Sequence, residues 1–362
     1  MLTRPFHLMA KSASSLCNIQ CDYCFYLDKP HHRAMKMNDE ILTNYIKNYI
    51  QQAPQQQITF IWQGGEPTLS GLDFFQRAVT LQQRYAGNKT IHNSLQTNGI
   101  LLNDNWCRFF KQYNFLIGIS LDGTESMHDG YRKNKSGKGT WRQVMNAVDL
   151  LQKHEVVFNT LTVIHRQNAK CGQALYQFLK SLGVDYMQFI PLMDAPEQQA
   201  AAQDYGQLLI DVFDTWRRQD IGVIAVQFIE QCLMAFLGYQ PSLCIFRPTC
   251  GDQMIIEQNG DIYSCDHYVY PQYNLGNIIE TPLRQITSCI KQQQFGLAKQ
   301  QLSTKCRQCE FQFACHGGCP KHRTLPQEMD YPHNQLCEAY YMALKHMAPH
   351  LSRLANQIKN NA

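Results

Sequence analysis

The chain has 362 residues, 44% of them apolar, and a formal net charge of +4 at pH 7. This length allows one large or two medium domains, each with a sizeable core. The small positive charge comes from scattered lysines and arginines, which does not favour a nucleic-acid partner. The sequence holds no run of 18 apolar residues and no secretory-signal pattern in its first eleven residues. We therefore expect no membrane association and a cytoplasmic location.

Fifteen cysteines stand out against this background. In a reducing compartment cysteines do not pair as disulfides, and secreted disulfide scaffolds are usually shorter and denser in cysteine. Clustered cysteines in a long cytosolic chain are instead typical of metal ligands.

In chain order, the first two thirds alternates short apolar runs with segments whose apolar residues recur every three or four positions. The apolar runs predict buried strands, and the periodic segments predict amphipathic helices. The expected strands are 58–62, 91–96, 115–121, 156–163 and 186–190. The expected helices are 41–50, after a candidate cap at Asn38, and 72–85, 104–113, 141–154 and 174–181.

This alternation predicts an α/β fold, with a parallel sheet and helices outside it. About six strand–helix units fit the pattern, fewer than the eight of a closed barrel. Further helices are expected at 205–218 and 226–237. After about residue 240, Gly, Pro and Asn interrupt every pattern and cysteines become frequent, which indicates a small domain held by metal. The predicted division is residues 1–235 and residues 236–362, with a helix at the C-terminus.

The first cysteine cluster is Cys17, Cys21 and Cys24, at the spacing C-x3-C-x2-C. Three thiolates on one tight loop can hold three irons of a four-iron cluster and leave the fourth iron open to a small molecule. A zinc site is the alternative, but structural zinc is normally closed by four ligands. His31 or His32 would have to supply the fourth.

A second motif, Gly64-Gly65-Glu66-Pro67, directly follows the strand expected at 58–62. Two glycines at a strand end let the backbone approach a ligand closely, and the Glu66 carboxylate could accept a hydrogen bond from an amine. An ordinary Gly-Pro turn is the alternative.

Together, the cysteine triplet and the GGEP segment resemble the radical S-adenosylmethionine (SAM) superfamily. The segments QTNG (96–99) and SLDG (120–123), at the ends of the next two expected strands, match that superfamily as well. The resemblance implies a partial (β/α)6 barrel, in which the open iron chelates the amino and carboxyl groups of SAM. Reduction of the cluster then cleaves SAM to methionine and a 5′-deoxyadenosyl radical.

Eight more cysteines lie in the last third of the chain, enough to close two four-iron clusters or, alternatively, two zinc ribbons. They are Cys244, Cys250, Cys265, Cys306, Cys309, Cys315, Cys319 and Cys337. The pattern resembles a SPASM domain, the auxiliary-cluster extension of peptide-modifying radical SAM enzymes. That resemblance assigns Cys244, Cys250, Cys265 and Cys319 to one cluster and the other four to a second, so that three [4Fe-4S] clusters are expected.

Spacing alone does not determine how these eight cysteines group, because many combinations are open. The assignment of four ligands to each auxiliary cluster therefore rests on the resemblance. The four remaining cysteines are expected to be inert buried thiols. They are Cys107, Cys171, Cys232 and Cys289.

The resemblance narrows to the anaerobic sulfatase-maturating enzymes. It rests on the segments 11–27 (KSASSLCNIQCDYCFYL), 62–72 (WQGGEPTLSGL), 93–99 (NSLQTNG) and 265–269 (CDHYV), and on the spacing of the auxiliary cysteines. That family oxidises a Cys or Ser of a sulfatase to Cα-formylglycine. The resemblance therefore implies a radical SAM oxidoreductase.

The implied chemistry gives Asp266 a role. After the radical removes a hydrogen from Cβ of the target residue, the remaining radical must lose one proton and one electron. The family match makes Asp266 the base that takes the proton, which is general-base catalysis, and the auxiliary clusters could accept the electron. An aspartate that only hydrogen-bonds solvent or a neighbouring ligand is the alternative.

The SAM-binding positions carried over from the family are Tyr23, Gly65, Ser120, Arg132 and Met193. Arg132 can bind a carboxylate or a ribose hydroxyl through its fork of donors, although without the resemblance it reads equally as a surface arginine. Met193 stands where the family has leucine and could still cover the adenine.

The implied partners are an unfolded or nascent sulfatase segment as substrate and a reducing electron donor such as flavodoxin or ferredoxin. Two alternatives remain open. A SPASM maturase that crosslinks side chains of a ribosomal peptide would share both cluster sets. A non-enzymatic metal-binding scaffold or redox sensor would hold zinc or clusters without turnover.

Overall fold

The computed structural model describes residues 4–26, 35–193, 195–326 and 329–361. The chain forms two compact units. The first unit consists of residues 1–120, 129–158 and 251–296, and the second of residues 121–128, 159–250 and 297–362. Each unit therefore combines segments that are far apart in the sequence.

The sheet of the first unit has the strand order β12-β11-β10-β1-β3-β4-β5. Its strands are β1 (His7–Lys11), β3 (Gln57–Gln63), β4 (Thr90–Thr97), β5 (Phe115–Ser120), β10 (Gln253–Glu257), β11 (Asp261–Tyr263) and β12 (Asn274–Asn277). The pairs from β10 to β5 are parallel, and β11 and β12 extend the sheet antiparallel. Because parallel strands end at the same edge, residues that close β10, β1, β3 and β4 meet there.

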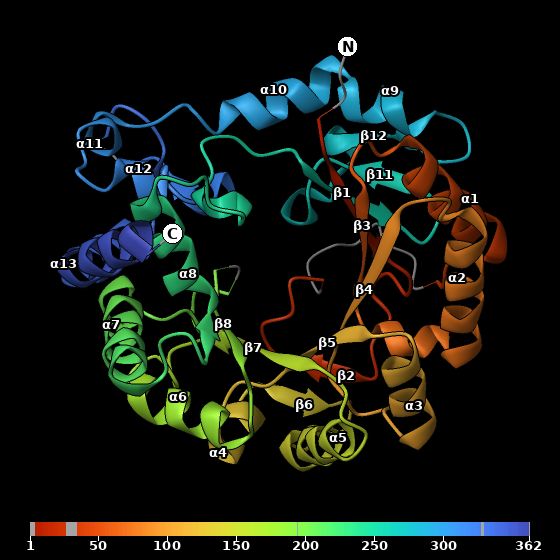
Figure 1. Ribbon diagram of the computed structural model, residues 1–362, viewed down its shortest axis with the longest axis horizontal. Coiled ribbons are helices and arrows are strands. Elements are labelled where there is room, and N and C mark those ends of the chain that lie inside the picture. Colours follow the sequence, from red (N-terminus) through yellow and green to blue (C-terminus); the bar gives the residue numbers. More distant parts are fainter. Residues whose placement is uncertain (1–3, 27–34, 194, 327–328, 362) are drawn as a thin grey trace. The chain divides into compact units, whose positions relative to one another are not determined.

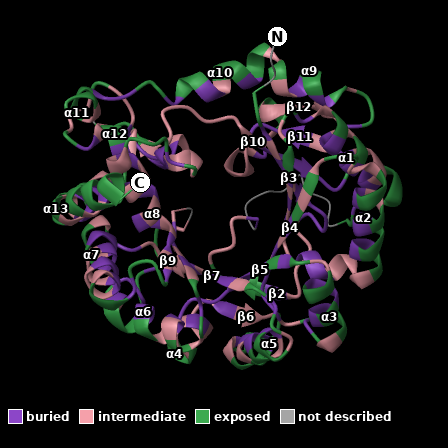
Figure 2. Ribbon diagram, viewed as in Figure 1, coloured by how far each residue is buried: buried purple, intermediate pink, exposed green. Residues whose placement is uncertain are grey.

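Helices cover this sheet, and α1 and α2 lie side by side outside β3 and β4 (Figure 1). The helices are α1 (Asp39–Gln52), α2 (Leu72–Tyr85), α3 (Asp104–Gln112), α5 (Trp141–Lys153) and α9 (Leu283–Ser288). Asn38 caps α1, because its side chain accepts from the amide of Ile41 at 2.9 Å. Figure 2 shows the buried residues along the strands and the exposed residues on the outer helix faces.

An aromatic cluster fills the space between α1, α2 and β3. The rings of Tyr45, Phe60, Trp62 and Phe75 are fully buried, and neighbouring ring centroids lie 5.4–5.7 Å apart in edge-to-face contacts. Such aromatic pairs add about 0.5–1.5 kcal/mol to the free energy gained from burial. These packed aromatic rings support the end of β3, which follows Trp62.

A short antiparallel ribbon stands apart from the main sheet. It pairs β2 (Ile19–Cys21) with β6 (Arg132–Asn134), and the register sets Cys21 opposite Arg132. The short helix α4 (Glu125–Asp129) precedes β6 in the chain. The ribbon therefore brings a predicted SAM-binding arginine to the predicted cluster loop.

The second unit contains the parallel strands β7 (Phe158–Ile164), β8 (Tyr186–Pro191) and β9 (Ala225–Val226). Its long helices are α6 (Gly172–Ser181), α7 (Ala202–Gln219), α8 (Gln227–Leu237) and α13 (Cys337–Asn361), and α13 packs against α7 and α8. Gly206 allows this approach, since a Cβ there would lie 2.9 Å from the Cα of Ala339. Short elements lie among the late cysteines of this unit: η2 (Cys244–Phe246), α11 (Thr304–Arg307), α12 (Gln312–Cys315), η5 (Pro320–His322), β13 (Arg323–Thr324) and β14 (His333–Asn334). Helix α10 (Ile290–Ala298) runs from the first unit into the second.

The five expected strands are confirmed as β3, β4, β5, β7 and β8, and the expected helices as α1, α2, α3, α5, α6, α7 and α8. The expected C-terminal helix is α13. The short strand β1 and the strands β10–β12 were not anticipated. Residues 251–296 group with the first unit, and the division at residue 235 stays a prediction. In the described part of the chain, no helix combines the length and the apolar character that crossing a bilayer requires.

Candidate active site

The first cysteine cluster spans β2, since Cys17 lies in the loop before this strand and Cys24 in the segment after it. Cys21 ends β2, and the amide of Cys24 donates to the Cys21 carbonyl at 3.2 Å. Burial, and then the negative charges of Glu66 and Cys24, raise the pKa of the Cys17 thiol. All three thiols are partly exposed. The three predicted ligands thus lie at and on either side of the short strand β2, each partly exposed.

The GGEP segment holds this loop by main-chain contacts. The amide of Gly65 donates to the Ser14 carbonyl at 2.6 Å, and the amide of Glu66 donates to the Leu16 carbonyl at 2.7 Å. A Cβ at residue 65 would lie 2.1 Å from the Leu16 oxygen, closer than any real contact. Only glycine fits at this position, because the two backbones touch.

Glu66 ties two strand ends together. Its carboxylate is fully buried and accepts hydrogen bonds from the hydroxyls of Thr68 and Thr97 at 2.6 and 2.7 Å and from the Asn98 amide at 2.8 Å. Burial raises the pKa of Glu66, and these hydrogen bonds oppose the shift. The expectation that Glu66 accepts from an amine is replaced by a structural role, since both oxygens bind the chain itself.

Asn98 is a neighbour of the cluster loop that the sequence did not single out, although it lies in the QTNG match. Its side-chain amide donates to Asn18 at 2.8 Å and lies 3.8 Å from the Cys17 sulfur. A donor beside a cluster thiolate stabilises the negative charge on sulfur. The family motif was the only signal that could have identified it.

Four of the five predicted SAM contacts belong to the first unit, and three of them lie on or against the cysteine loop. The Arg132 guanidinium lies 4.0 Å from the Cys21 sulfur and 5.5 Å from the centre of the Tyr23 ring. Gly65 contacts the same loop through Leu16. Ser120 is buried at the end of β5. Met193 follows β8 in the second unit and is half-buried.

Asp266 forms an ion pair that the sequence did not anticipate. It follows Cys265 directly and opens η3 (Asp266–Tyr268), and its Oδ1 lies 2.6 Å from the Nζ of Lys11. The Lys11 side chain is fully buried, whereas 26% of the Asp266 side chain is exposed. Lys11 also donates to Gln63 at 2.6 Å. The predicted base is therefore accessible on one side and held by a buried cation on the other.

In the second unit, four of the late cysteines lie together. They are Cys306 on α11, Cys309 between α11 and α12, Cys315 at the end of α12 and Cys337 at the start of α13. Burial raises the pKa of Cys315 to about 12, and the charges of the other three contribute to the shift. Four thiols that act on one another in this way match the ligand set that the resemblance implies.

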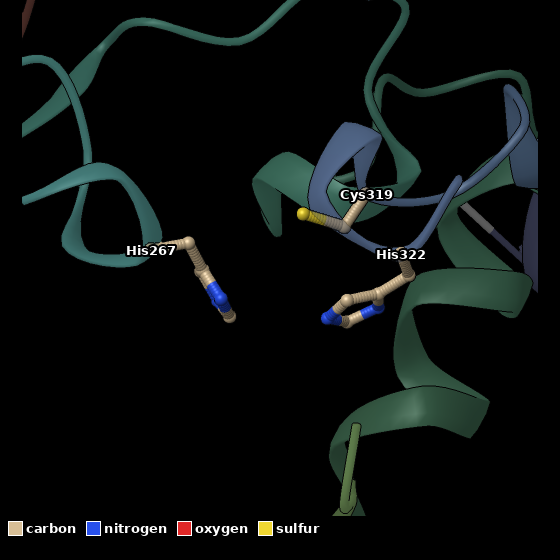
Figure 3. Close-up of side chains that lie close together, drawn as sticks. All are labelled: His267, Cys319 and His322. Atoms are coloured by element: carbon tan, nitrogen blue, oxygen red, sulfur yellow. The ribbon is translucent and has the colours of Figure 1, made fainter. Parts of the chain in front are cut away.

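Cys244, Cys250 and Cys319 form a second group, with the buried Lys299 beside them. The Lys299 ammonium donates to the carbonyls of Cys244 and Ile245 at 2.5 and 2.9 Å. Its positive charge opposes the effect of burial on the pKa of all three thiols. Figure 3 shows Cys319 at the start of the η5 turn that ends at His322. Cys265, the fourth cysteine of this predicted set, belongs to the first unit.

The four unassigned cysteines differ in burial. Cys107 and Cys232 are buried, and burial raises the pKa of both, to about 11 for Cys107. Cys171 and Cys289 are only half-buried, so the expectation of four buried thiols is wrong for these two. Each lies at a helix end rather than on a helix face. The candidate zinc ligands His31 and His32 lie outside the described residues.

Two family models match the chain. A radical SAM superfamily model matches residues 12–179, and an iron-sulfur cluster-binding domain model, SPASM, matches residues 244–310. The first match contains the cysteine triplet and the GGEP segment. The second contains five of the eight late cysteines.

Relatives match over nearly the whole chain. The serine-type anaerobic sulfatase-maturating enzyme of Bacteroides thetaiotaomicron is 37% identical over 99% of this chain and 93% of its own length. The cysteine-type enzyme of Clostridium perfringens is 32% identical over 98% of this chain and 100% of its own. The chain belongs to the family of anaerobic sulfatase-maturating enzymes. Members named for either target residue match, so identity alone does not choose between them.

A solved structure of this family agrees with the fold. Native anSMEcpe with bound AdoMet and the Kp18Cys peptide has a TM-score of 0.92 and 31% identity, over 98% of this chain and 100% of that chain. Streptococcus suis SuiB with bound S-adenosylmethionine shares the fold alone, with a TM-score of 0.65 and 15% identity over 89% of this chain and 74% of that one. The expected α/β fold with a radical SAM part and a SPASM part is confirmed.

Iron–sulfur clusters and SAM are the cofactors of sulfatase-maturating enzymes of this type. The residues of this chain fit such groups. The triplet offers three thiols on one loop, and the Gly65 main chain closes against that loop where any side chain would collide. The group of four, Cys306 to Cys337, offers a complete thiolate set.

Proposed function

We propose that this protein matures a sulfatase under anaerobic conditions, by SAM-dependent oxidation of a Cys or Ser to Cα-formylglycine. Family membership over the full chain supports the reaction class. The observation that carries the proposal is the ion pair of Asp266 and Lys11, which presents a partly exposed carboxylate at the edge where the parallel strands end. Carboxylates at that edge are typical of active sites in parallel sheets.

The reaction removes two hydrogens from the target side chain: one hydrogen atom from Cβ, and one proton together with one electron from the remaining radical. When bound, SAM and the clusters supply the 5′-deoxyadenosyl radical that takes the hydrogen atom and accept the remaining electron. Asp266 takes the proton from the thiol or hydroxyl, which becomes much more acidic once Cβ is a radical. A positioned carboxylate contributes about 10²–10⁴-fold in such a step.

The predicted site residues divide by task. Cys17, Cys21 and Cys24 would hold the cluster that binds SAM, and Tyr23, Gly65, Ser120, Arg132 and Met193 would contact SAM. Support comes from the Arg132 guanidinium, which lies within 5.5 Å of the Tyr23 ring and 4.0 Å of the Cys21 sulfur. The eight late cysteines would hold the two auxiliary clusters, in the sets that the resemblance assigns.

The substrate would be an extended segment of a sulfatase that has not yet folded. A relative of known structure, native anSMEcpe, was solved with bound AdoMet and the Kp18Cys peptide, which supports a peptide substrate. We place the reaction in the cytoplasm and expect flavodoxin or ferredoxin to deliver the electron that reduces the first cluster. The domain division at residues 1–235 and 236–362 follows the two cofactor-binding parts.

The test is a peptide assay with anaerobically reconstituted protein, SAM and a reductant. Two peptides with the same sulfatase motif are compared, one with Cys and one with Ser at the target. Aldehyde formation replaces sulfur and two hydrogens by oxygen in the Cys peptide, and removes two hydrogens from the Ser peptide. Mass spectrometry of both peptides therefore identifies the product and the preferred target.

Two outcomes would overturn the proposal. A crosslink within the peptide without aldehyde would identify a peptide maturase instead. Zinc without iron in the purified protein would identify a scaffold, because three four-iron clusters require about twelve irons per chain.

A further inference from the structure

Lys11 is a fully buried lysine at the edge where the parallel strands end. Its ammonium contacts the Asp266 carboxylate at 2.6 Å and donates to the Gln63 side chain at 2.6 Å. Gln63 in turn donates to Gln96 on β4. A buried ammonium costs several kcal/mol unless it is paired, so these contacts are what permits a lysine here.

The strand register shows that Lys11 belongs to a polar row. Lys11 stands opposite Glu257 on β10 and opposite Gln63 on β3. Residues in register on neighbouring strands point to the same face of the sheet. Glu257 is 1% exposed, so a second buried carboxyl group ends the neighbouring strand.

The pKa of Tyr26 indicates that charged groups gather at this place. Burial, and then the negative charges of Glu257 and Asp266, raise the pKa of this tyrosine well above its usual value. The Lys11 ammonium lies 5.7 Å from the centres of both the Phe25 and the Tyr26 rings. The Lys11 ammonium therefore contacts one carboxylate, that of Asp266, and lies near two aromatic rings.

Lys11 itself has no access to a substrate. Its side chain is fully buried, and the GGEP backbone covers its stem, since a Cβ at Gly64 would lie 3.7 Å from its Cδ. Asp266 keeps 26% of its side chain exposed. The accessible group of this pair is the carboxylate, and the inaccessible group is the cation.

We propose that Lys11 is a positioning residue, which holds the Asp266 carboxylate in a fixed orientation toward the substrate and which acts only through Asp266. This inference rests on the proposed function, and it goes beyond it by giving Lys11 a role, although the sequence did not single out Lys11 as a site residue. The charge-assisted contact of the buried ammonium with Oδ1 limits the rotation of the carboxylate.

The proton balance is consistent with this role. The substrate O–H or S–H bond breaks, and its proton passes to the Asp266 carboxylate, which becomes neutral. Lys11 neither gains nor loses a proton.

The test is a double-mutant cycle of Lys11→Met and Asp266→Asn in anaerobically reconstituted enzyme, with aldehyde and 5′-deoxyadenosine measured separately. We expect Lys11→Met to lower kcat for aldehyde about 10- to 100-fold, with KM for the peptide and 5′-deoxyadenosine formation within about threefold of the wild type. The double variant should be no slower than Asp266→Asn alone, because a residue that acts only through Asp266 has nothing left to contribute.

Lys11 has only a structural role if the rate losses of the two single variants multiply in the double variant. The same conclusion follows if Lys11→Met lowers aldehyde and 5′-deoxyadenosine formation to the same extent. Lys11→Gln, which keeps a donor but no charge, enters the same cycle if Lys11→Met does not load iron. If neither variant loads iron, Lys11 is required for folding and the proposal is wrong. The matched control is Lys153→Met, which removes the lysine of the exposed Lys153–Asp104 pair at 2.7 Å and should retain full turnover.

The two proposals fail in different ways. If the wild type forms no aldehyde from either sulfatase peptide, the proposed function fails. If the wild type forms aldehyde and the ratio of aldehyde to 5′-deoxyadenosine in Lys11→Met equals that of the wild type, only the proposed role of Lys11 is wrong.

Discussion

Lys11 in the first unit and Lys299 in the second are both fully buried, yet they are held differently. Lys11 contacts a carboxylate and a side-chain amide. Lys299 donates to two backbone carbonyls, and no carboxylate in the described ranges lies within 4.0 Å of its ammonium. Burial lowers the pKa of Lys299 to about 8, and the charges of Cys244, Cys250 and Cys319 oppose that shift.

The difference indicates what each cation is for. Lys11 has a counter-charge in the chain itself, so its pair is complete before any cofactor binds. Among the described residues, the charges that raise the pKa of Lys299 are those of the thiols Cys244, Cys250 and Cys319, which are predicted cluster ligands. The first lysine would organise a base, and the second would set how readily a cluster accepts an electron.

The largest effect is expected at Gly65, where the GGEP backbone touches the segment that follows Lys11. Gly65→Ala places a Cβ 2.1 Å from the Leu16 oxygen, so the cysteine loop must move. We expect loss of the first cluster, a fall in iron from about twelve to about eight per chain, and no SAM cleavage. Iron analysis and 5′-deoxyadenosine measurement test this. Gly87→Ala, where a Cβ meets nothing within 4 Å, is the control and should keep all the iron.

Asp266→Asn removes the anionic half of the Lys11 pair. The amide cannot take up a proton, so aldehyde formation should fall about 100-fold or more, while SAM cleavage continues. The ratio of aldehyde to 5′-deoxyadenosine measures this directly. Asp261→Asn, on β11 in the same unit, serves as control. An unchanged ratio for Asp266→Asn would contradict its role as the base.

Lys299→Met tests the other side of the comparison. Removing a buried positive charge disfavours the more negative, reduced cluster, so the reduction potential of the cluster at Cys244, Cys250 and Cys319 should fall. The expected shift is on the order of 60 mV, a tenfold change for a one-electron couple. A redox titration followed by electron paramagnetic resonance measures it. Lys345→Met, an exposed lysine on α13, should leave the potential in place. If the reduction potential in Lys299→Met equals that of the wild type, the proposed difference in role between Lys11 and Lys299 is wrong.

The smallest effect is expected for an exposed pair. Hydrogen bonds from Lys153, and then from His154, lower the pKa of Asp104 to about 2. A depressed carboxyl pKa stabilises the folded state above the unfolded value of 3.8 and loses that effect as the pH falls toward 2. Because the pair is exposed, Lys153→Met should move the melting temperature at pH 7 by about 1 °C or less. A fall of several degrees in a thermal melt would show that exposed and buried lysines do not differ here as argued.

Local periodicity was enough to predict most of the fold. The strands β3, β4 and β5 and the helices α1 and α2 appear within one or two residues of the expected positions, and Asn38 caps α1 as its sequence pattern indicates. These features depend on neighbouring residues, which a pattern records directly.

Contacts between distant segments could not be predicted in this way. Strand β1 is only five residues long, and its pairing with β10 joins residue 7 to residue 253. The Lys11–Asp266 ion pair depends on this strand pairing, so no local sequence pattern predicts it. A similar limit applies to Glu66, since its motif does not reveal whether the carboxylate faces a ligand or, as observed, Thr97 and Asn98.

The pairing of β1 with β10 also has a consequence for synthesis. A ribosome makes Lys11 at the beginning of the chain and Asp266 about three quarters of the way along it. Until residues 253–257 emerge, β1 has only one of its two neighbours, and Lys11 lacks its partner until Asp266 has been added. Long-range pairing of this kind forms slowly and late. The Lys11–Asp266 pair therefore cannot form until most of the polypeptide has been translated, however early the cysteine loop is complete.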